Sequence, residues 1–312
     1  FCLSRGLGDV YKRQLLTLPI LGIVIFTILP LVFMICMAFT SYSKVGDHLT
    51  IFHWVGLKNF STVLGMGNSI GKTFWSVLGW TLIWAVLATF LNYILGMILA
   101  IVINRKTTRI KGFWRFCFML SAAIPQFVSL LLMRTMLKDN GLINNLLVQA
   151  GLISSPLPFL TNATWARATV VIINLWVGIP FTMMQVTGIL QNIPGELYEA
   201  ARVDGAGPVT IFFKITLPYM LFVTTPYLIT TFTGNINNFN VIYLLTAGAP
   251  VPVGATAGKT DLLVTWLYKL TVDLQYFNVG AVVGILTFVI LAVVSLITYR
   301  NTGSYKNEEG FQ

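Results

Sequence analysis

The residues in this sequence that could bind a ligand are amide side chains inside long apolar segments. Asn174 lies in one such segment, and Asn235 and Asn238 lie in another. Polar groups in apolar segments of membrane-spanning length are costly unless they face a cavity or another helix. An amide donates and accepts hydrogen bonds, which suits a neutral ligand rich in hydroxyls, such as a sugar, better than an ion. The alternative is that these amides hydrogen-bond neighbouring helices, which is how Asn92 and Gln126 are interpreted.

Helical geometry extends both sets of polar residues into stripes. At about 100° per residue, side chains three, four or seven positions apart lie on one face of a helix. On the later segment this stripe contains Thr231, Asn235, Asn238 and Ile242. On the earlier segment it contains Asn174, Gly178, Phe181 and Gln185. Two such stripes facing one cavity would form half of a sugar-binding site.

Catalytic chemistry has no support in the sequence. No Ser/His/Asp or Cys/His set and no carboxylate pair is evident, and the three cysteines are scattered. Gly71-Lys72-Thr73 ends like a phosphate-binding P-loop, but the glycine required at its start falls on Met66. The chain is therefore expected to be no enzyme and to bind no metal or cofactor. Any ATP that drives it would be hydrolysed by a separate subunit.

The composition places these residues in membrane lipid. Of the 312 residues 56% are hydrophobic and 10% are charged, whereas a soluble domain carries about a quarter charged residues. The net charge of +10 could suggest a nucleic-acid partner. However, the basic residues flank apolar runs, as they do in the cytoplasmic loops of membrane proteins. We therefore expect no nucleic-acid binding.

Six segments are long and apolar enough to cross a bilayer as helices, which takes about 20 residues. They are Leu15–Phe39, Phe74–Ile103, Gly112–Leu137, Ala168–Leu190, Tyr219–Leu245 and Phe277–Tyr299. The sequence therefore predicts an all-α membrane protein with six transmembrane helices. The loops between them are too short for a core of their own, so residues 15–312 are expected to form one transmembrane domain.

Basic residues set the predicted orientation. The densest basic cluster lies between the second and third segments and contains Arg105, Lys106, Arg109, Lys111 and Arg115. Because Lys and Arg concentrate in cytoplasmic loops, this loop is expected inside, together with both termini and the loop between the fourth and fifth segments. The predicted outer loops are Thr40–Thr73, Lys138–Arg167 and Thr246–Tyr276.

Residues 1–14 are treated separately. The run Asp9–Gln14 resembles the translation of a transposon end that is used to prepare sequencing libraries. The segment is therefore expected not to be native, and no function is drawn from it. An ordinary basic tail is the alternative.

The loop of residues 194–218 contains a motif of fixed spacing. It reads Glu199-Ala200-Ala201, three residues, Gly205, nine residues, and then Ile215-x-Leu217-Pro218. Pro194 and Glu199 favour a short helix, Gly205 and Gly207 allow a turn with positive φ, and Pro208 begins a second short helix. The predicted structure is a compact helix-turn-helix that leads into the fifth span.

This motif resembles the EAA loop of binding-protein-dependent ABC importer permeases, in which the loop docks on the ATPase subunit. The resemblance implies the type I importer permease fold. It also implies that the residues coupled to the ATPase are Glu199, Ala200, Ala201, Gly205, Ile215, Leu217 and Pro218. A solvated amphipathic loop is the alternative interpretation.

Two further stretches resemble the maltose/maltodextrin branch of these permeases, in its short form. They are the run Asn174–Phe181 and the run Asn235–Phe239. The resemblance implies that sugar is contacted by Asn174, Val177, Gly178, Phe181, Thr231, Gly234, Asn235 and Asn238. Phe181 stands where the enterobacterial type has tyrosine, and Gly234 where it has phenylalanine, which leaves the exact oligosaccharide open.

The resemblance also implies the partners and the location. The chain would work in the bacterial cytoplasmic membrane, surrounded by lipid, as half of a pathway for a maltodextrin-like oligosaccharide. The other components would be a second, MalG-like permease, a MalK-like ATPase dimer and an extracellular sugar-binding protein. Two alternatives stay open: a permease for another oligosaccharide, such as a galacto-oligosaccharide, and an ion-coupled secondary carrier. A carrier of that kind usually needs an ionisable group within its spans, and none is evident.

Overall fold

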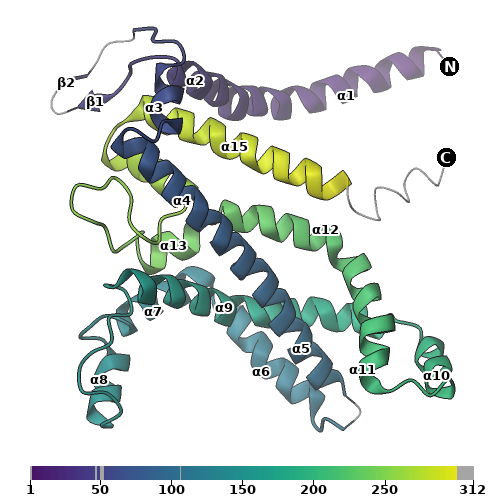
Figure 1. The fold of residues 1–312 in the computed structure, drawn as a ribbon. Helices are drawn as coiled ribbons and strands as arrows, with labels where there is room; N and C mark the ends of the chain where they lie inside the picture. The colour runs from purple at the N-terminus through teal and green to yellow at the C-terminus, as the bar shows by residue number, and fades with distance from the viewer. Residues whose placement is uncertain (1, 46–47, 50–52, 106, 301–312) are drawn as a thin grey trace. The chain divides into compact units, whose positions relative to one another are not determined.

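The computed structural model describes residues 2–45, 48–49, 53–105 and 107–300, which are almost entirely helical (Figure 1). Lys106 of the basic cluster and residues 301–312 of the expected transmembrane domain lie outside the described residues. The chain divides into two compact units, each described here by itself. The first comprises Phe1–Lys72 and Leu267–Leu286, and the second comprises Thr73–Trp266 and Thr287–Gln312.

The first unit begins with one continuous helical stretch, whose end is capped by the side chain of Asn59. Its elements are α1 (Cys2–Ile23), η1 (Val24–Ile28), α2 (Leu29–Ala38), β1 (Lys44–Val45), β2 (His48–Leu49) and α3 (Lys58–Leu64). The two short strands pair antiparallel. The buried side chain of Asn59 donates hydrogen bonds to the carbonyls of Ala38 at 2.9 Å and Thr40 at 2.7 Å. These bonds satisfy carbonyls that the end of α2 leaves without a helical partner.

The second unit contains the candidate site. Its helices, some of which extend into the first unit, are α4 (Ser69–Val86), η2 (Leu87–Leu91), α5 (Asn92–Asn104), α6 (Lys111–Ala123), α7 (Gln126–Met136), α8 (Leu142–Gln149), α9 (Ala163–Gln191), α10 (Gly195–Val203), α11 (Pro208–Ile211), η3 (Phe212–Thr216), α12 (Leu217–Ile236), α13 (Phe239–Leu245), α14 (Leu263–Tyr268) and α15 (Phe277–Arg300). The remaining element, η4 (Lys269–Asp273), belongs to the first unit. The η1, η2 and η3 elements are π-helical turns inside longer helices, and η4 is the π-helical end of the helix that begins with α14.

Five helices within the described residues are long and apolar enough to cross a membrane. They are Gln14–Ala38, Ser69–Asn104, Ala163–Gln191, Pro208–Ile236 and Phe277–Thr298. The bent pair α6 and α7 makes a sixth span when it is counted as one. The prediction of an all-α membrane protein with up to six spans is therefore confirmed.

The third span is not the single helix predicted over Gly112–Leu137. Helices α6 and α7 meet at an angle of 83°. Between them Ile124 and Pro125 are extended, with ψ of 127° and 129°. Proline disfavours the helical conformation of the residue before it and has no N–H to continue the helix. The break therefore follows from Pro125.

The fifth span also differs from the predicted segment Tyr219–Leu245. It begins already at Pro208 and ends at Ile236. Asn238 then adopts an extended conformation, with φ of −80° and ψ of 94°, and its side chain accepts a hydrogen bond from the N–H of Val241 at 3.2 Å. Asparagine favours such capping positions because its side chain replaces a missing helical partner. The stripe predicted through Asn238 and Ile242 on one straight helix is therefore wrong.

Two buried tryptophans tie α4 to later parts of the second unit. The indole N–H of Trp84 donates to the backbone carbonyl of Asn235 at 3.1 Å, and that of Trp80 donates to the carbonyl of Thr260 at 3.2 Å. Both side chains are almost completely buried. A buried indole needs a hydrogen-bond acceptor, so these two contacts fix both α12 and the loop after α13 against the second span.

The loop after α13 is held by a buried carboxylate. Asp261 is fully buried and accepts hydrogen bonds from the N–H of Gly258 at 2.6 Å and the hydroxyl of Thr265 at 2.9 Å. A Cβ atom at Gly258 would overlap the carbonyl of Gly248. The loop predicted on the outer side thus packs on itself around one acidic side chain.

Replacing Asp261 by alanine is expected to destabilise this loop. The change leaves the buried N–H of Gly258 without its acceptor, while the hydroxyl of Thr265 keeps the carbonyl of Leu262 at 3.1 Å. An unsatisfied buried donor costs about 1–3 kcal/mol. The measurement is the midpoint of thermal unfolding of the detergent-purified protein. The control is Asp273→Ala, because Asp273 is exposed. Equal midpoints for the two variants would contradict this account of the loop.

Candidate functional site

A short exposed helix follows the end of α9. Helix α10 begins at Gly195, directly after Pro194, whose ψ of 128° is extended. Pro194 therefore lies directly before α10 and not in its first turn. Glu199 lies in the middle of α10 and is exposed, as is Ala200, whereas Ala201 is half-buried. Figure 1 shows α10 beside the start of α11, beyond the end of α9.

The turn after α10 has a defined glycine cap. Gly205 has a φ of +76°, and its N–H donates to the carbonyl of Arg202 at 3.0 Å. The N–H of Ala206 donates to the carbonyl of Ala201 at 2.9 Å. This is the Schellman arrangement, which requires a left-handed residue that glycine adopts without strain. Gly207 does not have the positive φ expected for it; it is extended at −73°, as suits a residue before proline.

The coupling loop, residues 194–218, combines firm attachment with apolar exposure. The hydroxyls of Tyr198 and Thr216 lie 3.2 Å apart, which joins α10 to η3. Val203 is 87% exposed and Val209 is 70% exposed. The remaining motif residues continue the chain: Ile215 lies in η3, and Leu217 and Pro218 open α12. The loop therefore exposes two apolar side chains, while Tyr198 holds α10 to η3.

The amide of Asn235 is buried and already has partners. Its Nδ2 donates to the hydroxyl of Thr89 at 2.9 Å, and its Oδ1 accepts from Nδ2 of Asn238 at 3.3 Å. The first bond joins α12 to η2, and the oxygen of Asn238 caps α13. In this conformation both amides hold helices in place, so a ligand would add to this network or replace part of it.

Asn174 differs from these two amides. Its side chain is 7% exposed, and no hydrogen-bond partner for it is found among the described residues. Two turns later on α9, Phe181 is 59% exposed. The amide of Asn174 therefore has hydrogen-bonding capacity that the described residues do not use, and the ring of Phe181 is open.

The other residues expected at the sugar site differ in how closely neighbouring atoms pack around them. A Cβ atom at Gly178 would overlap Nδ2 of Asn92, whose Oδ1 accepts a hydrogen bond from the hydroxyl of Thr182 at 2.9 Å. Gly178 is thus where the side chain of Asn92 crosses α9. A Cβ at Gly234 would meet no atom within 4 Å. Val177 and Thr231 are half-buried.

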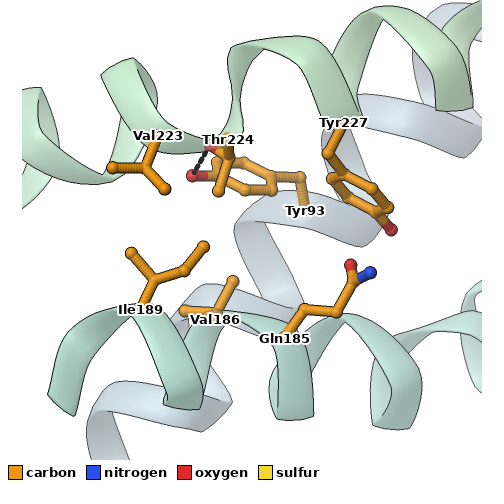
Figure 2. A pocket seen from close by; sticks show the side chains of 7 residues that line it. All are labelled: Tyr93, Gln185, Val186, Ile189, Val223, Thr224 and Tyr227. Atoms are coloured by element: carbon orange, nitrogen blue, oxygen red, sulfur yellow. Dashed lines mark hydrogen bonds between the residues drawn. The ribbon is translucent and has the colours of Figure 1, made fainter. Parts of the chain in front are cut away.

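A cavity of about 280 Å³ lies between α5, α9 and α12 (Figure 2). Its lining consists of Tyr93, Gln185, Val186, Ile189, Val223, Thr224 and Tyr227. Sequence reasoning placed Gln185 on the polar stripe of α9 but missed the two tyrosines. The available signal was spacing, because Tyr227 precedes Thr231 by one helical turn.

The chain is similar to a described family and to characterised relatives. Residues 92–302 match the model of the "Binding-protein-dependent transport system inner membrane component". The galactooligosaccharide permease GanP of Bacillus subtilis (strain 168) is 38% identical over 93% of this chain and 70% of its own length. The maltodextrin permease MdxF of the same organism is 37% identical, over 97% and 71%. For the maltose/maltodextrin permease MalF of Escherichia coli (strain K12) the figures are 35%, 79% and 49%.

Solved structures show the same fold. A bacterial ABC transporter involved in import of the acidic polysaccharide alginate contains a chain with a TM-score of 0.71 and 23% identity, covering 95% of this chain and 97% of that one. A second structure of a bacterial alginate transporter, in complex with an alginate pentasaccharide-bound periplasmic protein, has a TM-score of 0.73 and 24% identity, covering 93% and 94%. The ABC importer permease fold is therefore shared.

Replacing Gly178 by alanine is expected to disturb the contact between α5 and α9. The added methyl group pushes the side chain of Asn92 away from Thr182, so we expect a loss of about 1–3 kcal/mol in stability. Gly188→Ala is the matched control, because it lies on the same helix with nothing within 4 Å. The midpoint of thermal unfolding distinguishes the two variants, and adding Asn92→Ala should restore the first, because alanine removes the overlapping amide without placing a glycine inside a helix. Failure of that rescue would contradict the proposed overlap.

Proposed function

We propose a sugar-import function, on the premise that this chain belongs to the family of binding-protein-dependent transport system inner membrane components. In this proposal the chain is the permease subunit of an ATP-driven importer and forms half of a pathway for a maltodextrin-like oligosaccharide. The observation that supports it most is the identity of 37–38% with oligosaccharide permeases over more than nine-tenths of the chain.

The residues of the candidate site suit a neutral sugar. The amide of Asn174 has no partner among the described residues, Phe181 is open, and a side chain at Gly234 would have space. Amides hydrogen-bond hydroxyls in both directions, and an aromatic ring can pack on the apolar face of a sugar ring. A galacto-oligosaccharide is the second candidate, and it is favoured by the 38% identity with GanP.

The coupling loop supports an ATPase partner. Importer permeases of this family work with a substrate-binding protein and an ATPase. We propose that the exposed face of α10 docks on a MalK-like ATPase dimer, and that a MalG-like permease forms the other half of the pathway. Because α10 is joined to η3 and follows directly after α9, closure of the ATPases would move both α9 and α12. Because α9 contains Asn174 and α12 contains Asn235, ATP binding would change the positions of these two amides around the sugar.

The cargo is tested by uptake into proteoliposomes. The complex of this chain with its second permease, its ATPase and its binding protein is reconstituted, and uptake of labelled maltotriose and β-1,4-linked galactotriose is measured. We expect ATP-dependent uptake of maltotriose. Uptake of galactotriose alone would favour the second candidate. Uptake of neither sugar, or uptake without ATP, would contradict the proposed function.

Glu199→Lys is expected to uncouple the ATPase from transport. Reversing this exposed charge in the middle of α10 should abolish ATP-driven sugar uptake, because it replaces the carboxylate proposed to make the polar contact with the ATPase by a group of opposite charge. Stability should not change, since the side chain is exposed. The control is Asp273→Lys, which reverses an exposed charge outside residues 194–218. Uptake by the Glu199 variant equal to that of the control would rule out the docking role.

A further inference from the structure

The cavity of Figure 2 includes Gln185, the last residue of the polar stripe on α9, and extends one helical turn beyond Thr231 on α12. Gln185 follows Phe181 by four residues on α9, and Tyr227 precedes Thr231 by four residues on α12. One turn advances about 5.4 Å, which is comparable to the length of one sugar ring. The direction is towards the coupling loop, because α9 leads into α10 and α12 continues from α11 and η3.

The lining has an apolar wall and a polar edge. Val186, Ile189 and Val223 form the apolar side, while Figure 2 shows the amide of Gln185 directed towards the ring of Tyr227. No hydrogen-bond partner for the side chain of Gln185 is found among the described residues. The cavity thus presents a free amide beside an aromatic ring.

The two tyrosines differ in how firmly they are held. The hydroxyl of Tyr93 lies 2.7 Å from that of Thr224, which in turn donates to the carbonyl of Met220. The hydroxyl of Tyr227 lies 3.4 Å from that of Thr182, a long contact that a ligand could replace. Tyr93 therefore forms a fixed wall, and Tyr227 keeps a hydroxyl for an incoming group.

The uncharged lining and the volume of the cavity restrict the class of ligand that it can bind. The lining residues carry no charged group, so an ionic ligand would be left without a counter-charge. A volume of about 280 Å³ lies at the lower limit of ligand pockets, which is about 300 Å³. That space suits one ring with apolar faces and hydroxyl edges rather than a chain of rings.

We propose that this cavity is a subsite for a single neutral sugar ring, on the coupling-loop side of the polar stripes. It holds the leading ring of an oligosaccharide whose following rings lie along Phe181 and Asn174. This subsite rests on the proposed function and extends it. A trisaccharide can place one ring in the cavity while its other two rings stay on the stripes. A disaccharide cannot occupy the cavity and both stripes together, so the cavity contributes less to its binding.

Cysteine protection tests the subsite in the complete transport complex. The three cysteines of the sequence, Cys2, Cys36 and Cys117, are first replaced by serine. Single cysteines are then introduced as Gln185→Cys, as Phe181→Cys on the stripe, and as Met184→Cys, the control on an exposed position outside the lining. The complex in lipid nanodiscs is labelled with a maleimide, with and without maltotriose, or galactotriose where that is the sugar transported. We expect the sugar to slow labelling of the first two cysteines about fivefold or more and of the control less than about twofold.

The outcomes separate the subsite from the proposed function. Protection of the cysteine at position 181 but not at 185 overturns the subsite and leaves sugar import standing. Protection of neither overturns both. A second measurement distinguishes loss of the subsite from loss of folded protein. Gln185→Leu should lower the ratio of trisaccharide to disaccharide uptake about fivefold, which corresponds to the free energy of about one hydrogen bond. Met184→Leu should leave that ratio unchanged, and an unchanged ratio in the Gln185 variant would contradict the subsite.

Discussion

The hydrogen bond from Asn235 to Thr89 is the contact on which the candidate site depends. In lipid a buried amide has no water to bond, so it must find a partner within the protein. This bond, together with that from Trp84 to the carbonyl of Asn235, holds α12 against the second span. The second span, through α5, and α12 also form two walls of the cavity, and α9 forms the third. Asn174 and Gln185, for which no partner is found among the described residues, are the amides that the proposed function assigns to the ligand.

The coupling loop could be predicted from the sequence because each of its features is local. Proline before α10 sets the start of a helix, and glycine at position 205 allows the left-handed cap at its end. Neither effect needs a distant part of the chain. The membrane spans could be predicted for a similar reason, since mean hydropathy over about 20 residues decides whether a segment prefers lipid.

The helix breaks could not be predicted in the same way. Pro180 and Pro226 lie inside the continuous helices α9 and α12, whereas Pro125 separates α6 from α7. Membrane helices tolerate proline where neighbouring groups satisfy the freed carbonyls, and those neighbours are set by the tertiary structure. The overlap of Gly178 with Asn92 and the pairing of Tyr93 with Thr224 depend on tertiary contacts too. Helical periodicity predicts the face of a residue but not its neighbour.

Geometry links the coupling loop to the proposed subsite more closely than to the amide stripes. The loop connects the ends of α9 and α12 through α10, α11 and η3, and the cavity lies between those two helices on the same side. A displacement of α10 therefore acts first on the walls formed by Val186, Ile189 and Val223, and only then on Asn174 and Asn235 further along. A ring held in the cavity would oppose closure of these walls, since a packed interior has little free volume. Occupancy of the subsite and movement of the coupling helix are thus expected to influence each other, because a ligand that binds one arrangement of two helices better shifts the population towards it.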